Sequence, residues 1–483
     1  MKNENVKSVK SIKRLTVFFS ICLLSIIAYL TYFTLYKAAQ VENDPTNQRI
    51  AIAESEVLRG SILDRDGNTL AHSEGTPENQ KRIYANGKAF SFATGYMSKI
   101  YGKTGIEDAY NEVLIGNTSS YDIFATFFRT LKEDLNEDDK LGANVMLTID
   151  SDAQQAAYNA IKDYKGGVAA INPSTGEVLA MVSNPTYDPG SIDSNFEKYS
   201  SDQKGAPMVN RVTRGYYPPG SVFKVVTASA AVESIDGIQQ QEFICNGGLK
   251  IGDYVLTDYG NTSHGKLDIK KGFGVSCNYT FGSIGIQLGY SRLKYYAEKF
   301  MFNKAITSRD DVDVLNIKSG SFTIDDSTND SLVAQNAIGQ NGVTTNPMHM
   351  AMVTGAIANG GVMMEPYIVK GITDRYGVGL MTDSSRVLSR AISAETAATI
   401  SDYMVYTVES GTGRNAKING VTIGGKTGSA ENTQGEETHS WFVAFAPAEK
   451  PEIAVAVVVE NAGTGGSRAA KIARAVIKAY LNK

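Results

Sequence analysis

One uncharged, mainly apolar run of 22 residues, at positions 15–36, constrains the fold of this 483-residue chain more than any other feature. An α-helix rises about 1.5 Å per residue, so a run of this length spans the ~30 Å hydrocarbon core of a bilayer. A cleaved signal peptide is the competing interpretation. Its apolar region would be only about 7–15 residues long, and no small-x-small cleavage site precedes Gln40. The sequence therefore predicts a single transmembrane anchor.

The charges beside this run predict its orientation. Five basic residues and one acidic residue precede it, and positive charge next to an apolar helix favours the cytoplasmic side of the membrane. We therefore expect a single-pass protein of the cell membrane. Residues 1–14 would form a cytoplasmic tail, and the chain after Lys37 would form an extracytoplasmic body.

The body has the composition of folded, water-soluble domains. Hydrophobic residues make up 42% of the chain and charged residues 20%, which excludes wholesale disorder and a polytopic membrane protein. Beyond the anchor, 50 acidic residues outnumber 42 basic ones, so electrostatics gives no reason to expect nucleic acid as a partner. The four histidines are scattered singly. We therefore expect no metal-ligand cluster and no cofactor.

The pattern of apolar residues predicts an α+β body. Residues 59–71 carry two short apolar stretches around an Asp66-Gly67 turn, as in a β-hairpin. An antiparallel sheet is expected from the strand-like runs at 166–171, 177–183, 421–428, 441–446 and 453–459. A long, mostly helical region lies between them, at about 220–360. The last segment has an apolar stripe at helical spacing, which should pack on the sheet.

The first chemically informative segment is 217–224, which contains Pro-Pro-Gly followed by Ser221. A helix cannot extend towards the N-terminus through Pro-Pro-Gly. We therefore expect a helix to begin at about Ser221 and to run into the core. Lys224 would then lie on the same face, one turn after the helix N-terminus. Burial lowers the pKa of a lysine, which can then take the hydroxyl proton of a nucleophilic serine. The structural alternative is an N-cap serine beside a lysine that reaches solvent.

Two further segments carry polar side chains that suit a substrate cleft. Ser276 and Asn278 are two residues apart and can present a hydroxyl and an amide to one cleft. Residues 424–429 end a strand that is rich in β-branched residues. Glycines in a strand indicate that another backbone or a ligand approaches closely. Lys426 and Thr427 can bind a carboxylate. Each motif alone is weak evidence for a substrate cleft. Ser-x-Asn pairs are typical of turns, and the segment 424–429 is also typical of a Gly-rich hairpin end.

The order of the three motifs is more informative than any of them alone. Ser-x-Asn follows Ser-x-x-Lys after 55 residues, and Lys-Thr-Gly follows after a further 150, as in penicillin-binding proteins and β-lactamases. The chain resembles the class B penicillin-binding proteins, the monofunctional D,D-transpeptidases of the bacterial cell wall. Further segments that carry the resemblance are 59–67, 104–107, 338–340, 346–347, 358–361 and 439–442.

The resemblance implies a division into domains and a reaction. A small, dimerisation-like pedestal domain would occupy 37–160. A transpeptidase domain, with an antiparallel sheet sandwiched by helices, would occupy 161–483. Its substrate would be a peptidoglycan stem peptide ending in D-Ala-D-Ala. Ser221 would attack and expel the last D-Ala, Lys224 would act as its base, and Ser276 would relay a proton to the leaving group. An amine of a neighbouring stem would then attack the acyl-enzyme, whereas a β-lactam antibiotic would leave the serine blocked.

The resemblance also implies substrate-binding roles. Asn278 would bind an amide of the donor peptide. Lys426 and Thr427, in the motif completed by Gly428 and Ser429, would hold the terminal carboxylate. The backbone N–H groups of the nucleophilic serine and of Ser429 would form the oxyanion hole.

Several alternatives stay open beside transpeptidation. With water in place of the amine, the same site would act as a D,D-carboxypeptidase or a slow β-lactamase, although the Glu-x-x-Leu-Asn motif of class A β-lactamases is absent. Residues 259–261, Tyr-Gly-Asn, are interpreted as a turn. A noncatalytic scaffold is a further alternative. No segment is long enough for a glycosyltransferase domain, so the resemblance implies a membrane glycosyltransferase of the elongation or division machinery as a partner.

Cys245 and Cys277 are the only cysteines outside the apolar run. The simpler interpretation makes Cys277 a small buried residue of the core. A disulfide between the two is the sharper hypothesis.

Overall fold

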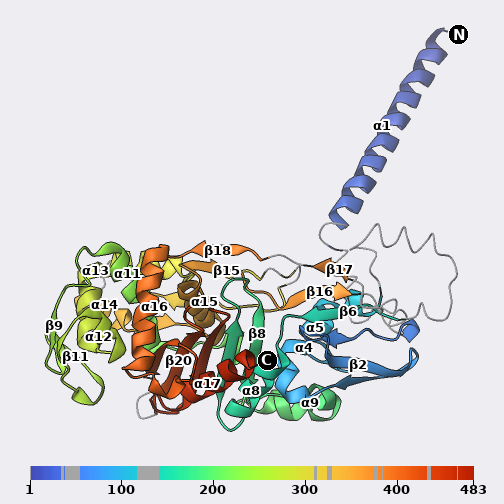
Figure 1. Ribbon diagram of the computed structural model, residues 1–483. Coiled ribbons are helices and arrows are strands. Elements are labelled where there is room, and N and C mark those ends of the chain that lie inside the picture. The colour runs from blue at the N-terminus through green and yellow to red at the C-terminus, as the bar shows by residue number, and fades with distance from the viewer. Residues whose placement is uncertain are drawn as a thin grey trace.

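The computed structural model describes residues 2–33, 37, 55–116, 141–308, 310, 313–323, 329–373, 379–382, 385–431, 437–464 and 466–482. The N-terminal helix is α1 (Lys2–Tyr32), drawn in blue in Figure 1. Its segment Lys13–Tyr32 has a mean hydropathy of 2.1, and none of it is buried. A single apolar helix near the N-terminus, long enough to cross a membrane, is thus present as expected. Residues 34–36 of the predicted run lie outside the described residues.

A six-stranded sheet lies at one end of the body, and four of its strands fall in residues 37–160, the range expected for the pedestal. Its strands, in spatial order, are β17 (Gly379–Thr382), β16 (Val369–Thr373), β6 (Asn144–Leu147), β1 (Ile62–Leu63), β2 (Thr69–Thr76) and β3 (Asn79–Tyr84). Strands β1 and β2 pair antiparallel, as predicted for residues 59–71, and β1 pairs parallel with β6. Two of the strands, β16 and β17, come from far along the chain, so the sheet joins the N-terminal region to the C-terminal part.

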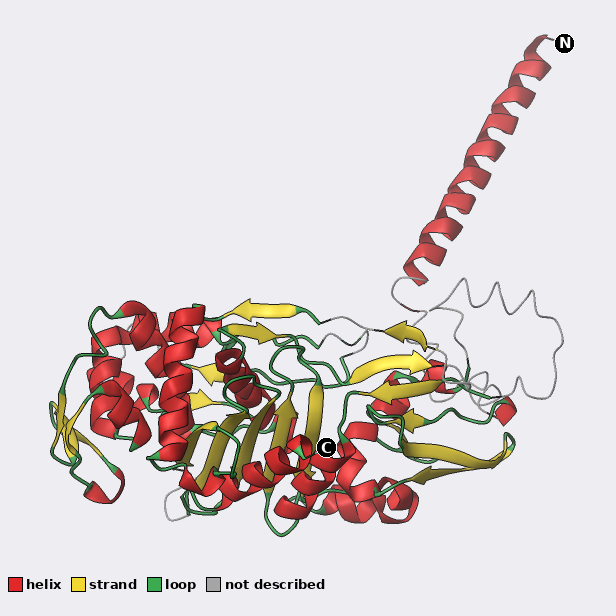
Figure 2. Ribbon diagram, in the orientation of Figure 1, coloured by secondary structure: helices red, strands yellow, loops and turns green. Residues whose placement is uncertain are grey.

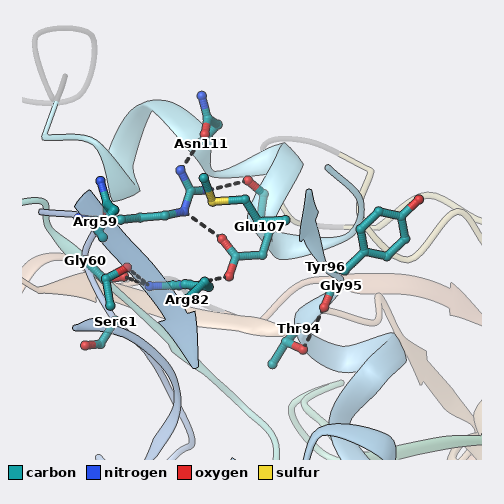
Figure 3. Close-up of polar contacts among 12 residues, drawn as sticks. Arg59, Gly60, Ser61, Arg82, Thr94, Gly95, Tyr96, Glu107 and Asn111 are labelled. Carbon is teal, nitrogen blue, oxygen red and sulfur yellow. Dashed lines mark hydrogen bonds and ion pairs between the residues drawn. The ribbon is translucent and has the colours of Figure 1, made fainter. Parts of the chain in front are cut away.

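Short elements follow β3 along the chain. They are α4 (Gly87–Thr94), β4 (Met97–Ser98), β5 (Gly102–Lys103), α5 (Ile106–Ala109) and α6 (Asn111–Leu114). They include the Thr-Gly-Ile-Glu segment, whose Glu107 is fully buried at the start of α5. Figure 3 shows the Glu107 carboxylate between two guanidinium groups. Arg59 Nε donates to it at 2.7 Å, and Arg82 Nε donates to its other oxygen at 2.7 Å.

This buried ion cluster ties the start of the body to the pedestal. Arg59 also donates to the backbone oxygen of Glu107 at 2.6 Å and to Asn111 Oδ1 at 2.6 Å, and Arg82 donates to the backbone oxygen of Gly60 at 2.7 Å. Burial raises the pKa of Glu107, but the charges of Arg82 and Arg59 outweigh it, and the net pKa lies below the ordinary value. The carboxylate is therefore held in its charged form.

We expect Glu107→Gln to lower the unfolding free energy of the pedestal by about 3–5 kcal/mol, because two buried guanidinium groups would lose their counter-charge. The change is measured as a shift of the unfolding transition in urea, with the exposed Glu74→Gln as the matched control. Because the folded pKa of Glu107 is depressed, its stabilisation is full above the unfolded pKa of about 4.3 and is lost as pH falls below it. Equal stability of the two variants at pH 7 would contradict a structural role for the cluster.

The C-terminal part is built on a five-stranded antiparallel sheet, seen near the centre of Figure 2. Its strands, in spatial order, are β19 (Gly424–Ala430), β20 (His439–Ala446), β21 (Ile453–Val459), β7 (Gly166–Ile171) and β8 (Val178–Asn184). All five predicted strand-like runs are thus present in one antiparallel sheet. The first of the three C-terminal strands begins at Gly424 rather than at 421.

Helices cover both faces of this sheet. Along β21, the side chains of Ala454, Ala456 and Val458 belong to one apolar core, whereas Val455 and Val457 belong to a second. Helices α15 (Pro347–Ala358) and α16 (Ala394–Glu409) pack on the first face, and α8 (Ser151–Ile161) and α17 (Arg468–Leu481) contact the sheet from the second. Figure 1 shows α17, in red, beside β20. The predicted C-terminal helix therefore packs on the sheet as expected.

The domain boundary expected at residue 160 stays a prediction. Helix α8 precedes it but packs on the five-stranded sheet through Ala153, Ala157 and Ile161. This helix therefore contributes to the core of the C-terminal part.

The region between β8 and β19 is mostly helical and supplies most of the candidate site. Its main elements are α9 (Ile192–Ser201), α10 (Arg211–Arg214), the 3₁₀ turn η5 (Gly220–Phe223), α11 (Lys224–Ser234), α12 (Ile269–Gly274), α13 (Asn278–Lys299) and α14 (Asp330–Ala337). Short strands lie among them: β9 (Phe243–Cys245), β10 (Gly248–Ile251), β11 (Tyr254–Thr257), β12 (Gly265–Leu267), β13 (Ser321–Phe322), β14 (Val343–Thr344), β15 (Val362–Met364) and β18 (Val387–Arg390). In Figure 1, α12, α13 and α14 lie at the end of the body opposite β2.

Candidate active site

The first motif lies where the chain enters helix α11. A single 3₁₀ turn, η5, precedes the α-helix, so the helical segment starts at Gly220, as predicted for about Ser221, but with a tighter first turn. Gly220 has φ +54°, and a Cβ there would lie 2.7 Å from the backbone oxygen of Ser429. Glycine is therefore required at this position, and the close approach brings the third motif against the first. Ser221 follows at the N-terminal turn, half-buried.

Lys224 points into the second motif. Its side chain is fully buried, and its Nζ donates to the backbone oxygen of Ser276 at 2.7 Å and to Asn278 Oδ1 at 2.7 Å. The Nζ also lies 3.4 Å from Ser276 Oγ and 5.5 Å from the ring centroid of Phe281. The alternative of a lysine that reaches solvent is therefore wrong.

The environment of Lys224 suits a base. Burial lowers its pKa to about 8, and the Asp258 carboxylate is among the groups that oppose this shift. A lysine with this pKa is partly neutral near physiological pH, so it can accept a proton without a large penalty.

The second motif forms a strained turn between α12 and α13. Ser276 has φ +62°, a conformation that non-glycine residues rarely adopt and that is often kept at functional sites. The backbone N–H of Asn278 donates to Asp258 Oδ1, and its side-chain Nδ2 donates to the backbone oxygen of Thr257 at 2.9 Å. These bonds fix Asn278 at the first position of α13. Its Oδ1 is left to accept from Lys224.

The third motif brings a second buried lysine to the same hydroxyl. Lys426, on β19, is fully buried, and its Nζ donates to Ser276 Oγ at 2.8 Å and to the backbone oxygen of Thr427 at 3.0 Å. Burial, together with the nearby charge of Lys224, lowers the pKa of Lys426 well below its ordinary value. A carboxylate beside Lys426 would favour the charged form of this lysine.

Close packing holds strand β19 against the first motif. A Cβ on Gly428 would lie 2.9 Å from Val222 Cγ1 and 3.0 Å from the backbone oxygen of Pro219. A larger residue would therefore push the strand away from the helix start. The hydroxyl of Thr427 shares a 2.6 Å hydrogen bond with that of Thr412.

The structure therefore brings all three predicted motifs together around Ser276. Lys224 approaches its hydroxyl from the helix, Lys426 approaches it from the strand, and Ser221 lies one turn before Lys224. The catalytic and binding roles expected for these residues stay predictions. The placement of the residues in one cluster is consistent with those roles.

Sequence reasoning missed several residues that shape this cluster. Asp258 anchors the second motif, Thr412 bonds Thr427, and the rings of Phe273 and Phe281 lie 5.5 Å from the two buried ammonium groups. No spacing rule points to them, because each comes from a separate element. Residues 259–261 form a short exposed 3₁₀ turn, as predicted.

Four side chains with metal-binding atoms lie together behind the second motif, where no metal-ligand cluster was expected from the sequence. They are Cys245, Asp258, His264 and Cys277, and their candidate ligand atoms all lie within 4.8 Å of one another. The fold of the β9–β12 segment, rather than a short motif, brings them together. Cys245 and Cys277 are free thiols, so the structure does not bear out the disulfide hypothesis.

Comparison with known proteins places the chain in a family. Residues 166–478 match the penicillin binding protein transpeptidase domain, and residues 59–145 match the penicillin binding protein A dimerisation domain. The chain belongs to the penicillin-binding proteins. It is 33% identical to the peptidoglycan D,D-transpeptidase PbpA of Mycolicibacterium smegmatis, over 98% of this chain and 99% of that protein.

Solved structures of penicillin-binding proteins share the fold. Penicillin-binding protein A from M. tuberculosis, in a ceftriaxone acyl-enzyme complex, is similar with a TM-score of 0.81 and 30% identity, over 89% of this chain and 99% of that one. The D,D-transpeptidase domain of a peptidoglycan glycosyltransferase from Eggerthella lenta is similar with a TM-score of 0.78 and 31% identity, over 88% and 99%. The expected family, α+β fold class and enzyme class are thereby confirmed.

Proposed function

We propose that this penicillin-binding protein cross-links peptidoglycan stem peptides through an acyl-enzyme on Ser221. The observation that carries the proposal is the approach of Lys224 and Lys426 to the Ser276 hydroxyl, one helical turn from Ser221. The relative from M. tuberculosis forms acyl-enzymes with β-lactams, which supports a serine nucleophile at the matching motif.

In the first step, Ser221 Oγ attacks the carbonyl of the D-Ala-D-Ala bond. Lys224, in its neutral form, takes the hydroxyl proton, because its burial favours the uncharged amine. Negative charge develops on the carbonyl oxygen beside the backbone N–H groups of Ser221 and Ser429, near the start of η5. The tetrahedral intermediate then collapses to an ester on Ser221.

The donor's terminal carboxylate binds at the third motif. Its charge stabilises the ammonium form of Lys426, which otherwise lies buried beside another lysine. The hydroxyl of Thr427 supplies a hydrogen bond, and Asn278 binds an amide of the donor. Substrate binding thus supplies a negative charge beside Lys426.

The leaving D-Ala amine needs a proton. Ser276 relays it in this proposal, and the contacts of its hydroxyl with Lys224 and Lys426 support that role. The C–N bond to the last D-Ala breaks as that proton arrives. An amine of a second stem peptide then attacks the ester, loses its proton to the same relay and forms the cross-link, which frees Ser221.

The topology and partners follow from the same proposal. The basic segment before the apolar helix would stay in the cytoplasm, and the catalytic domain would face the cell wall. A membrane glycosyltransferase would supply the glycan strands, since this chain would only cross-link them. β-Lactams, as mimics of the donor, would acylate Ser221.

The reaction type is tested with the full-length chain in detergent and a D-Ala-D-Ala donor peptide. We expect D-Ala release to accelerate when an amine acceptor is added, with a cross-linked peptide as the product. A rate of D-Ala release that does not change with the acceptor, with the shortened donor as the only product, would instead identify a D,D-carboxypeptidase. Rapid hydrolysis of penicillin would identify a β-lactamase.

A further inference from the structure

The outer face of the C-terminal helix α17 carries a row of basic side chains. Arg468, Lys471, Arg474 and Lys478 are all exposed and recur every three or four residues, so they lie on one face of the helix. The helix contains no acidic residue. Within the part of the chain that the structure describes, none of the four is in an ion pair. The body beyond the anchor is acidic overall, with 50 acidic residues against 42 basic ones, so this basic row is a local reversal of charge.

A pocket of about 490 Å³ lies at the N-terminal end of the basic row. It is lined from the end of α8 and from the first turn of α17, with Tyr164, Ser467, Arg468 and Lys471 among its lining residues. Figure 1 shows the two helices beside each other. The guanidinium of Arg468 lies 5.3 Å from the ring centroid of Tyr164, and its Nη1 donates to the backbone oxygen of Ala462 at 3.2 Å. These two contacts hold Arg468 at the wall of the pocket.

The first turn of α17 adds positive charge where a helix is usually stabilised by negative charge. The N-terminus of a helix carries a partial positive charge and favours acidic side chains. Here Arg468 and Lys471 occupy the first and fourth positions, and the turn has no acid. The N-cap hydroxyl of Ser467 donates to the backbone oxygen of Thr464 at 2.8 Å and does not cap the helix. An anion in the pocket would therefore lower the electrostatic cost of this turn.

We propose that the basic row and its pocket bind a linear polyanion with repeated phosphate groups. One phosphate would occupy the pocket beside Arg468 and Lys471, and others would lie along Arg474 and Lys478. The row extends about 15 Å, at about 1.5 Å per residue, so it matches a chain of anionic groups better than a single one. Arginine binds a phosphate through two parallel hydrogen bonds, and lysine binds it as a point charge.

Lipid headgroups also carry phosphate, but the packing of α17 favours a polymer over a bilayer. A helix that binds a membrane surface buries an apolar face in it. On α17, the apolar side chains of Ile472, Val476 and Ile477 are buried in the second core of the five-stranded sheet, so this face is already covered. A flat bilayer would contact the exposed side of the helix without filling the pocket beside it.

The source of the polymer depends on the orientation of the chain. If the catalytic domain faces the cell wall, the partner is an anionic polymer of the cell envelope. This step rests on the proposed function, whereas binding of the polyanion itself does not.

Binding of fluorescently labelled inorganic polyphosphate to the full-length chain in nonionic detergent tests the inference. We expect binding that weakens as salt is added, because the charges are exposed. The double variant Lys471→Glu/Arg474→Glu should lose at least about tenfold in affinity, since two attractive charges become repulsive. Lys250→Glu/Lys304→Glu is the matched control. It changes the net charge equally at two exposed lysines, on β10 and after α13, and should bind as the wild type does.

A lysine footprint of the wild type needs no variant and so does not depend on variant folding. Polyphosphate should protect Lys471 and Lys478 from acetylation and should leave Lys250 and Lys304 reactive. A wild-type chain that does not bind polyphosphate would overturn the inference. An equal loss of affinity in the control variant, or protection of the control lysines instead of the basic row, would overturn it as well.

Two further samples separate this inference from its competitors. Phosphatidylglycerol added to the detergent micelles tests the lipid source. Protection of the basic row by this lipid, without binding of polyphosphate, would overturn the polymer as the partner. Penicillin labelling of the same chain tests the proposed function separately. A labelled chain that does not bind polyphosphate contradicts only this inference, and an unlabelled chain that binds it contradicts only the proposed reaction.

Discussion

Ser221→Ala is expected to abolish labelling by a fluorescent penicillin and to abolish D-Ala release from a donor peptide. The variant keeps the helix start but lacks the hydroxyl that we propose forms the ester. We expect the variant to form no acyl-enzyme, because the covalent pathway requires the hydroxyl of the nucleophile. The substitution removes one half-buried hydroxyl, so the unfolding transition should change little.

Ser234→Ala is the matched control for this variant. Ser234 ends the same helix, and its hydroxyl donates to the backbone oxygen of Ala230 at 2.5 Å, away from the three motifs. It should label and react as the wild type does. A Ser221→Ala chain that still supports growth of a strain dependent on this gene would favour the noncatalytic scaffold.

Lys224→Met is expected to slow acylation by penicillin about 10²–10⁴-fold, the range for loss of a general base. Methionine has a similar length and no charge, so the buried position stays filled and no desolvated ammonium is required. Lys271→Met, an exposed lysine on α12, is the matched control and should acylate at the wild-type rate. Measurement of the acylation rate constant by stopped-flow or quench labelling checks both.

The wild type and Lys224→Met should also differ in the pH dependence of acylation. Because burial lowers the pKa of Lys224 to about 8, the fraction of neutral amine rises with pH through that region. The wild-type acylation rate should therefore rise towards pH 8 and above, and the rise should be absent in Lys224→Met. A variant that keeps the wild-type rate and pH profile would show that another group takes the proton.

Much of the fold could be predicted from local sequence. The apolar run, the strands β7 and β8 around their tight turn, and the stripe on α17 all follow from periodicity, because each element buries one face or one continuous segment. The partner of β1 could not be predicted in this way. It pairs with β6, more than 80 residues later, and β16 joins the same sheet from beyond residue 368. Such pairings depend on tertiary context.

The candidate site, like the fold, could be predicted only in part from local sequence. The Pro-Pro-Gly segment predicted a helix start at about Ser221, and the order of the motifs predicted which residues would meet. The sequence did not predict that Lys426 and Lys224 both contact the Ser276 hydroxyl, because this depends on how β19 packs against the helix. Nor did it reveal Asp258, which lies outside every motif but bonds the backbone of Asn278.

The proposed reaction requires a stable acyl-enzyme on Ser221. Its mass can be followed over time on the full-length chain after mixing with penicillin G, and peptide mapping then locates the adduct. We expect one added penicillin per chain, located on the peptide that contains Ser221 and persisting long after free penicillin is removed. An adduct on a different residue, or no adduct on a folded chain, would contradict the claim.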